Sequence, residues 1–255
     1  MKKKKSKILI VALLTIFFIG AFHIEAKAEP IQVPKVNISV DGTENPKDYV
    51  SNIKLLLVLT VLSMLPAFVI MMTSFTRIIV VFSFLKSSMG AQQAIPNQIL
   101  VGLALFLTIF IMSPVYTDIN NNAFKPYMEG TISQEEAMTK GSKPLREFML
   151  KQTRQKDLQL FVEASGMKED VDKDTIPLKV VVPAFAISEL KTAFQIGFLL
   201  YIPFMIIDLV VASVLMSMGM FMLPPVMISL PFKLLLFVMV DGWYLLVKSM
   251  IMSFA

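Results

Sequence analysis

The stretch from Gly197 to Pro231 constrains the fold more than any other part of the chain. It reads GFLLYIPFMIIDLVVASVLMSMGMFMLPPVMISLP, an apolar run long enough to enter a bilayer, with a single carboxylate, Asp208, near its middle. The run ends in a segment that is crowded with methionine and closed by prolines. An apolar run that keeps an acid and ends in flexible thioethers indicates a conduit and its seal rather than a simple anchor.

The composition places the whole chain among membrane proteins with several spans. Of its 255 residues, 55% are hydrophobic and only 17% are charged. The formal net charge of +5 comes from the first 28 residues, which hold six lysines and one acid, and basic and acidic side chains balance in the rest. Without a basic patch beyond that leader, nucleic acid is not an expected partner.

Two absences narrow the possible chemistry. The sequence has no cysteine, and its one histidine, His23, lies in the N-terminal leader. Disulfides, thiolate nucleophiles and cysteine-ligated metals are therefore excluded, and loss of the leader would also remove histidine-dependent triads and zinc sites. An intramembrane protease would need a Ser-His pair, HExxH or a paired-Asp motif such as GxGD, and none is present. We expect no enzyme, no metal site and no cofactor.

Residues 1–28 have the three parts of a cleavable signal peptide. A lysine-rich start precedes the apolar core ILIVALLTIFFIGAF, and Ala26 and Ala28 stand just before Glu29. We predict cleavage between Ala28 and Glu29, and an uncleaved first transmembrane helix is the alternative. Residues 29–52, with prolines at 30, 34 and 46, are predicted to form an extended extracytoplasmic lead-in.

Four apolar segments beyond the leader predict an all-α integral membrane protein. They run over residues 55–72, 99–116, 184–216 and 234–247, and the first continues through Arg77 into IIVVFSFL. We predict that they form two helical hairpins, over residues 53–116 and 184–255.

A small helical insertion of residues 117–183, on the extracytoplasmic side, separates the two hairpins. Ser133 and Glu136 have the spacing of a capping box at the start of a helix. Gly141 is predicted to end that helix and Pro144 to lie in the first turn of the next. Apolar residues then recur at helical intervals, at Leu145, Phe148, Met149, Leu158, Phe161 and Val162. We expect these short amphipathic helices to pack on one another or on a neighbouring copy.

Each apolar segment contains or adjoins an ionisable side chain. Such groups are costly in a bilayer unless they are paired or hydrated, so we predict that they are buried and act in assembly or gating. Arg77 either faces protein or snorkels to the membrane boundary. Asp208 needs a basic partner, for which Lys233 and Arg77 are the candidates. The full set comprises Arg77, Glu189, Lys191, Asp208, Lys233 and Asp241.

A proton-coupled transporter subunit that uses Asp208 and Asp241 as carriers is the functional alternative. Internal inverted repeats would favour it, and we find none in the sequence.

Methionine is concentrated around a pair of prolines. Residues 216–227 include five methionines. Gly219 and the pair Pro224-Pro225 predict a loop with hinges here rather than a helix. Because a thioether side chain is unbranched and adaptable, the cluster can close an irregular opening and yield when something passes. Methionines that face lipid or fill a core are the alternative, and the glycine and paired prolines favour a channel gasket of Met218, Met220, Phe221 and Met222.

Three long blocks carry a family resemblance. They are MLPAFVIMMTSFTRIIVVFSFL, QAIPNQILVGLALFLTIFIMSPV and KTAFQIGFLLYIPFMIIDLVVASVLMSMGMFMLPPVMISLPFKLLLFVMVDGWYLL. They resemble the FliP family, the flagellar members of the core export-gate proteins of type III secretion. In that family the loop before the paired prolines often carries three successive methionines that form a gasket. The matching positions are Met220, Phe221 and Met222, with phenylalanine as a departure.

The resemblance implies a ring of five copies that encloses a channel for unfolded flagellar proteins. It places that ring in the bacterial inner membrane, at the flagellar basal body. It also implies FliQ and FliR as partner subunits, FlhB and FlhA as further partners, and no cofactor.

Overall fold

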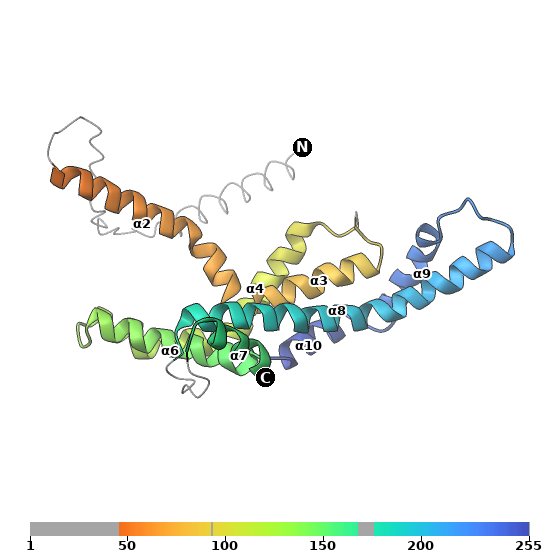
Figure 1. The fold of residues 1–255 in the computed structure, drawn as a ribbon. Coiled ribbons are helices and arrows are strands. Elements are labelled where there is room, and N and C mark those ends of the chain that lie inside the picture. The colour runs from red at the N-terminus through yellow and green to blue at the C-terminus, as the bar shows by residue number, and fades with distance from the viewer. Residues whose placement is uncertain (1–45, 93, 168–175, 255) are drawn as a thin grey trace, which may run out of the picture. The chain divides into compact units, whose positions relative to one another are not determined.

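The computed structural model describes residues 46–92, 94–167 and 176–254, and within these ranges every regular element is helical (Figure 1). The chain divides into two compact units, residues 1–57 and 58–255, and every helix from α3 onward belongs to the second. The predicted signal peptide, its cleavage residues Ala26, Ala28 and Glu29, and residues 30–45 of the lead-in lie outside the described ranges.

The first apolar block forms two helices rather than one continuous segment. α2 spans Pro46–Met71 and α3 spans Phe75–Ser88. At the break, the hydroxyl of Thr76 donates a hydrogen bond to the carbonyl oxygen of Ile70, 3.1 Å away, so a side chain satisfies an acceptor at the end of α2. The start of α2 corrects the predicted extended lead-in, because residues 46–52 are helical. A proline suits a first helical turn, where its missing N–H has no helical partner to lose.

The second apolar segment runs further than predicted. α4 spans Asn97–Ile119 and continues through a π-helical turn, η1 (Asn120–Phe124), into α5 (Lys125–Met128). The polar residues beyond the predicted end do not stop the helix, and the amide of Asn122 hydrogen-bonds the carboxylate of Asp118, one turn away on the same face. The insertion therefore begins within a continuous helical rod.

The insertion contains two further helices, α6 (Gln134–Gln152) and α7 (Gln155–Ala164). The predicted cap is confirmed, since Ser133 Oγ accepts the backbone N–H of Glu136 at 3.2 Å. The predicted stop at Gly141 and the new start at Pro144 are wrong, because both residues lie inside α6. Gly141 lies against η1: a Cβ placed there would lie 3.4 Å from the Cβ of Ala123, an ordinary van der Waals distance. Tertiary contact outweighs the local preference.

The third segment is one helix of 40 residues, α8 (Leu178–Ser217), about 60 Å long at the usual rise per residue. Its start corrects the boundary predicted at Pro183, which lies inside the second turn and removes only one hydrogen bond. The long helix is therefore shared between the insertion and the membrane-grade part of the chain.

The fourth segment is bent rather than continuous. α9 spans Pro225–Met239 and α10 spans Gly242–Met252, and their axes differ by 63°. The bend lies at Asp241, which has a left-handed φ of 51°. Aspartate is one of the few residues with a side chain that adopts this conformation readily. Gly242 follows because a Cβ there would lie 2.3 Å from the ring of Phe237.

Two buried apolar clusters hold the second unit together. In the first, α3 packs along α8 and against α4, with residues of α9 and α10 at its edge; its most buried members are Ile78, Val81, Phe82, Ala104, Ala193 and Met250. In the second, α6 and α7 pack on the first turns of α8, through Met149, Leu158, Val162, Val181, Ala184 and Phe185. The amphipathic helices of the insertion thus pack on α8 of their own chain.

Among the described residues, three helical stretches are long and apolar enough to cross a membrane: Ile53–Met71, Asn97–Met128 and Leu178–Ser217. The bent pair α9 and α10 makes a fourth if it counts as one span. In the part of the chain that the structure describes, the prediction of an all-α protein with several membrane-grade helices is confirmed. The hairpin arrangement and the ring stay predictions.

Candidate functional site

The methionine segment is a loop, as its glycine and prolines predict. Residues 218–224 connect the end of α8 to the start of α9 (Figure 1). The N–H of Met220 donates to the carbonyl oxygen of Leu215 and that of Gly219 to Met216, both at 3.0 Å, and Gly219 has a φ of 75°. This is the Schellman arrangement that ends a helix, for which glycine carries the left-handed position without strain. Pro225 then occupies the first turn of α9.

The side chains of this loop are apolar and exposed. Met222 is 96% exposed, Phe221 77%, Met218 63% and Met220 40%. A cluster of large apolar side chains on a loop rather than in a core marks a surface that meets another apolar surface. The hinge residues Gly219, Pro224 and Pro225 hold the two ends of the loop, because each restricts or permits the backbone conformation at its position.

A buried ion pair lies on the helices behind the loop. Lys233 of α9 donates to Asp208 of α8, with 2.7 Å between Nζ and Oδ2; 2% of the lysine side chain and 26% of the aspartate side chain are exposed, so the cation is the buried partner. The other carboxylate oxygen accepts the hydroxyl of Ser229. Lys233 Nζ also donates to the carbonyl oxygen of Ser88, 3.0 Å away at the C-terminal end of α3, where a positive charge complements the helix dipole. The predicted partnership of Asp208 with Lys233 is confirmed.

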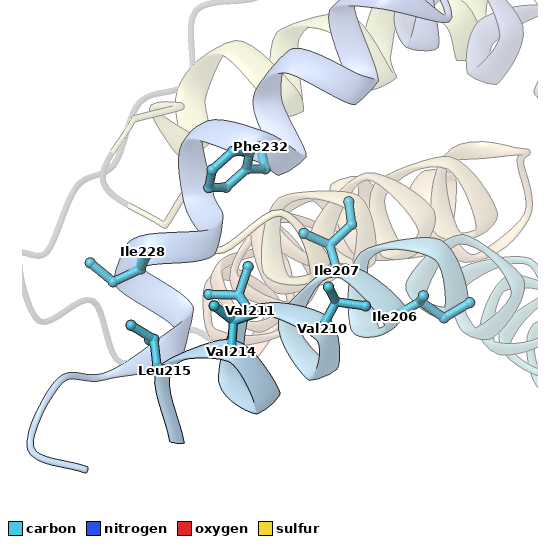
Figure 2. Close-up of a pocket in the computed structure, with 8 residues that line it drawn as sticks. All are labelled: Ile206, Ile207, Val210, Val211, Val214, Leu215, Ile228 and Phe232. Atoms are coloured by element: carbon cyan, nitrogen blue, oxygen red, sulfur yellow. The ribbon is translucent and has the colours of Figure 1, made fainter. Parts of the chain in front are cut away.

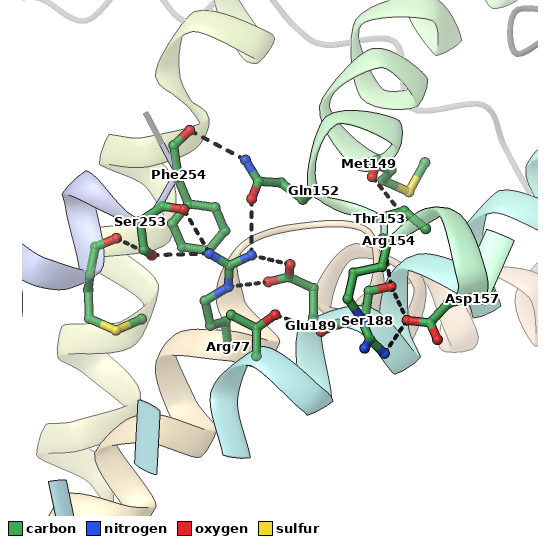
Figure 3. Close-up of polar contacts among 12 residues, drawn as sticks. Arg77, Met149, Gln152, Thr153, Arg154, Asp157, Ser188, Glu189, Ser253 and Phe254 are labelled. Atoms are coloured by element: carbon green, nitrogen blue, oxygen red, sulfur yellow. Dashed lines mark hydrogen bonds and ion pairs between the residues drawn. The ribbon is translucent and has the colours of Figure 1, made fainter. Parts of the chain in front are cut away.

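A second buried pair joins Arg77 of α3 to Glu189 of α8 (Figure 3). The guanidinium group binds both carboxylate oxygens, one of them through Nε at 2.8 Å. Its other N–H groups reach Gln152 Oε1 at 3.1 Å and the carbonyl and hydroxyl oxygens of Ser253 at 3.0 and 3.1 Å. The ring of Phe254 lies 3.8 Å from the guanidinium carbon. Arg77 therefore faces protein and does not snorkel, and it joins α3, α6, α8 and the C-terminal end.

A third polar cluster, which sequence reasoning missed, joins α7 to α8 (Figure 3). Ser188 Oγ donates to Asp157 Oδ2 at 2.6 Å and accepts the backbone N–H of Arg154 at 3.1 Å. Arg154 also pairs with Asp157. Burial by itself raises the pKa of Asp157, but the hydrogen bonds from Ser188 and Arg154 and the charges of Arg154 and Lys191 together lower it below its ordinary value. The sequence signal was an arginine and an aspartate three residues apart at a helix start.

Two of the predicted charges are not part of these buried pairs. Lys191 and Asp241 are exposed, so they are not buried within one chain. Glu189 and Lys191 are two residues apart on a helix and therefore face different directions, one inward and one outward. Asp241 lies at the α9–α10 bend. In the described residues, no three side chains of the acidic, histidine or cysteine type converge as a metal site would require.

An apolar pocket of about 460 Å³ lies between α8 and α9 (Figure 2). All its lining side chains are aliphatic or aromatic, among them Val211, Leu215 and Phe232. Leu215 precedes the end of α8 by two residues and Ile228 lies in the first turn of α9, so the pocket adjoins the methionine loop. The surface around the loop is thus apolar on the helices as well.

Comparisons with known proteins match most of the chain. The model of the FliP family matches residues 58–250. A flagellar biosynthetic protein FliP from Bacillus subtilis (strain 168) is 59% identical over 217 residues, which is 85% of this chain and 98% of that protein. The protein of the same name from Aquifex aeolicus (strain VF5) is 49% identical over 225 residues, 88% of this chain and 92% of its own length.

A third relative carries the same name. The flagellar biosynthetic protein FliP from Pectobacterium carotovorum subsp. carotovorum is 55% identical over 203 residues, 80% of this chain and 79% of that protein. The matched range includes the whole of α3 to α9, and therefore the methionine loop and the helices that carry both ion pairs. The family resemblance is therefore confirmed, and the chain belongs to the FliP family.

Proposed function

We propose that this chain is a membrane subunit of the flagellar protein export apparatus. In this proposal several copies enclose a channel for unfolded flagellar proteins, and loop 218–224 closes that channel. Membership of the FliP family supports the flagellar role, and the three or four membrane-grade helices support insertion into the bacterial inner membrane at the flagellar basal body. The activity needs no catalytic residue and no cofactor in this chain.

The exposed methionine loop is the observation that carries the channel proposal. Met218, Met220 and Met222 flank Phe221 on a loop whose side chains are 40–96% exposed. Flexible thioethers adapt to irregular surfaces and exclude water and ions, and they can separate when a polypeptide passes. Phe221 keeps the apolar character but has fewer rotatable bonds than methionine, so it forms the stiffer centre of the seal.

Assembly with other copies would cover apolar surface that one chain leaves exposed. Large apolar side chains are exposed on α8 and α9, including Phe198, Leu209, Val214, Phe232 and Val238. Hydrocarbon or neighbouring subunits can cover such surface, and water cannot do so without cost. We propose a ring of five copies with FliQ and FliR as partner subunits, and FlhB, FlhA and unfolded export substrates as further contacts.

The two buried ion pairs give this ring subunit a fixed frame. Asp208 and Lys233 join α8 to α9 on the helices that carry the loop, and Lys233 also ties them to the end of α3. Arg77 and Glu189 join α3 to α8 near the insertion. We propose that these pairs act in assembly or gating because they fix the positions of α8 and α9, the helices that carry the loop. Lys191 and Asp241, which are exposed, are proposed to meet neighbouring subunits.

The transporter alternative is not favoured. Asp208 is held by Lys233 and Ser229, whereas Asp241 is exposed at the bend between α9 and α10. The family membership points to flagellar biosynthesis instead of solute transport.

Cross-linking tests whether the loops of several copies converge. The sequence has no cysteine, so Met222→Cys introduces a single thiol into the full chain. Mild oxidation of the membrane-embedded complex should then join subunits as covalent dimers, because a disulfide forms only where two Cα atoms approach within about 7 Å. Met222→Ser, which has no thiol, is the matched control. An intact complex of the Met222→Cys variant that does not cross-link would contradict convergence of the loops.

A further inference from the structure

The methionines of this chain fall into exposed and buried groups. In the loop, Met222 is 96% exposed and Met218 is 63% exposed. Four others are almost fully buried in the two apolar clusters or beside them: Met89, Met112, Met149 and Met250, none above 1%. Accessibility controls how fast a thioether is oxidised, so one chain contains both a reactive set and an internal unreactive reference.

The loop is also the place where oxidation would have the largest physical effect. The chain has no cysteine that could consume an oxidant first. Other exposed methionines, such as Met239, lie on apolar helices that a membrane or a partner would cover, and Met138 lies in the insertion. In the loop, Met218, Met220 and Met222 lie within three residues of Phe221 in sequence and are 40–96% exposed, so a change at sulfur alters three of its exposed apolar side chains.

We propose that Met218, Met220 and Met222 form a reversible oxidation site, at which peroxide converts the thioethers to sulfoxides and thereby opens the seal. The reaction site is argued from the exposure of these side chains in one chain and from the composition of the loop. Its access to peroxide in the complex and the opening of the seal both rest on the proposed function, in which the loops line the channel.

The reaction balances with hydrogen peroxide as the oxidant. The sulfur lone pair forms a bond to one peroxide oxygen, the O–O bond breaks, and the transferred oxygen gives its proton to the departing hydroxide, which leaves as water. The sulfur is oxidised and the peroxide is reduced. In the reverse direction a dithiol-dependent methionine sulfoxide reductase removes the oxygen as water and becomes a disulfide.

The product differs from the thioether in the property that a seal requires. A sulfoxide oxygen is a strong hydrogen-bond acceptor and draws water to the side chain, whereas a thioether leaves water out. Phe221 does not react and remains apolar between its changed neighbours. Oxidation therefore hydrates the flanks of the loop while its centre stays unchanged.

Mass spectrometry of the native complex tests the site itself. The purified full-length complex is titrated with hydrogen peroxide, and each methionine is scored for the gain of one oxygen atom. We expect Met218, Met220 and Met222 to be oxidised severalfold faster than Met112 and Met149. Equal rates for the loop and the buried methionines would overturn the site.

Conductance of the same complex in planar bilayers tests the consequence. We expect peroxide to raise the conductance of the wild-type complex and the reductase to restore it. The variant Met218→Leu/Met220→Leu/Met222→Leu, which has no sulfur in the seal, should show no change between its own values before and after peroxide. Met138→Leu, which removes an exposed methionine of the insertion, should respond as the wild type does.

A tight wild-type complex with a fully oxidised loop would overturn the proposed switch. That result is distinguishable from failure of the proposed function, which alanine substitution of the loop tests without any oxidant. If the alanine variant leaks and the oxidised wild type does not, the result supports the seal and contradicts the oxidation switch.

Discussion

Lys233 on α9 binds Asp208 on α8 across 2.7 Å and at the same time donates to the carbonyl oxygen of Ser88 at the end of α3, 3.0 Å away. One ammonium group thus joins three helices on the side from which the methionine loop projects. A buried pair of this kind is costly to break, because removal of one partner leaves an unpaired charge.

The first prediction follows from that pair. Asp208→Ala leaves the buried Lys233 ammonium without its carboxylate, and we expect a loss of about 3 kcal/mol in the free energy of unfolding together with impaired assembly and motility. Lys233→Met should have the same sign and a smaller size, because the Asp208 carboxylate is 26% exposed and keeps its hydrogen bond from Ser229. In the double variant Asp208→Ala/Lys233→Met, the loss should be smaller than the sum of the two single losses. Thermal unfolding of the purified complex measures it, and additive losses would show that the two side chains are not coupled.

The second prediction concerns Arg77. Lysine keeps the charge but cannot bind both oxygens of Glu189 and also reach Gln152 and Ser253, so Arg77→Lys should destabilise the protein by about 2 kcal/mol. Limited proteolysis should then cut near the C-terminus more readily. Gln195→Ala, at an exposed position on α8, is the control and should leave the cleavage pattern unchanged. The same cleavage pattern for wild type and Arg77→Lys would show that the contacts of Arg77 with Gln152 and Ser253 do not hold the C-terminal residues in place.

The third prediction tests the close approach of α3 and α8. A Cβ at Gly197 would lie 2.5 Å from the ring of Phe84 and 2.9 Å from its Cβ, so the ring cannot simply rotate away. We expect Gly197→Ala to cost about 1–3 kcal/mol of stability. Gly102→Ala is the matched control in α4, with no atom within 4 Å of the added carbon, and should be neutral or stabilising. Equal effects of the two substitutions on thermal unfolding would refute the close contact.

The fourth prediction is a dependence on pH. The lowered pKa of Asp157 means that its carboxylate stabilises the fold above its unfolded pKa of about 3.9, and that this contribution is lost as the pH falls through the lower folded value. Asp157→Asn should therefore reduce stability near neutral pH by about 2 kcal/mol, and the difference from the wild type should close in acid. Glu163→Gln, at an exposed position on the same helix, serves as control. A difference that persists unchanged into acid would be the contrary result.

The sequence predicted the loop because every local signal there agrees with the tertiary structure. Gly219 ends α8 and Pro225 begins α9, and no distant contact opposes either preference. Where a distant contact does oppose local preference, the prediction was wrong. Gly141 and Pro144 lie inside α6, and Pro183 lies inside α8. Packing against neighbouring helices offsets a local cost of about 1 kcal/mol for the glycine and about 3 kcal/mol for each proline.

Charged side chains stand out in apolar segments because burying a charge is unfavourable, so the sequence indicates which residues need partners. It does not indicate which acid pairs with which base. Arg77 and Glu189 are 112 residues apart in sequence. From the sequence alone, either Arg77 or Lys233 could be the cation that pairs with Asp208. Only the packing of α3 and α9 against α8 decides which cation meets which acid. The cluster of Arg154, Asp157 and Ser188 was missed because two of its members lie in the insertion, where charged residues are common and do not indicate a site.

If loop 218–224 seals a channel, ion leakage through the assembled complex must depend on its apolar side chains. The variant Met220→Ala/Phe221→Ala/Met222→Ala removes apolar volume from the loop and touches neither buried ion pair. We predict a complex of wild-type size on a native gel whose conductance in planar bilayers is well above that of the wild type, and slower growth of cells that overproduce it. A complex of wild-type size that is as tight as the wild type would contradict the account.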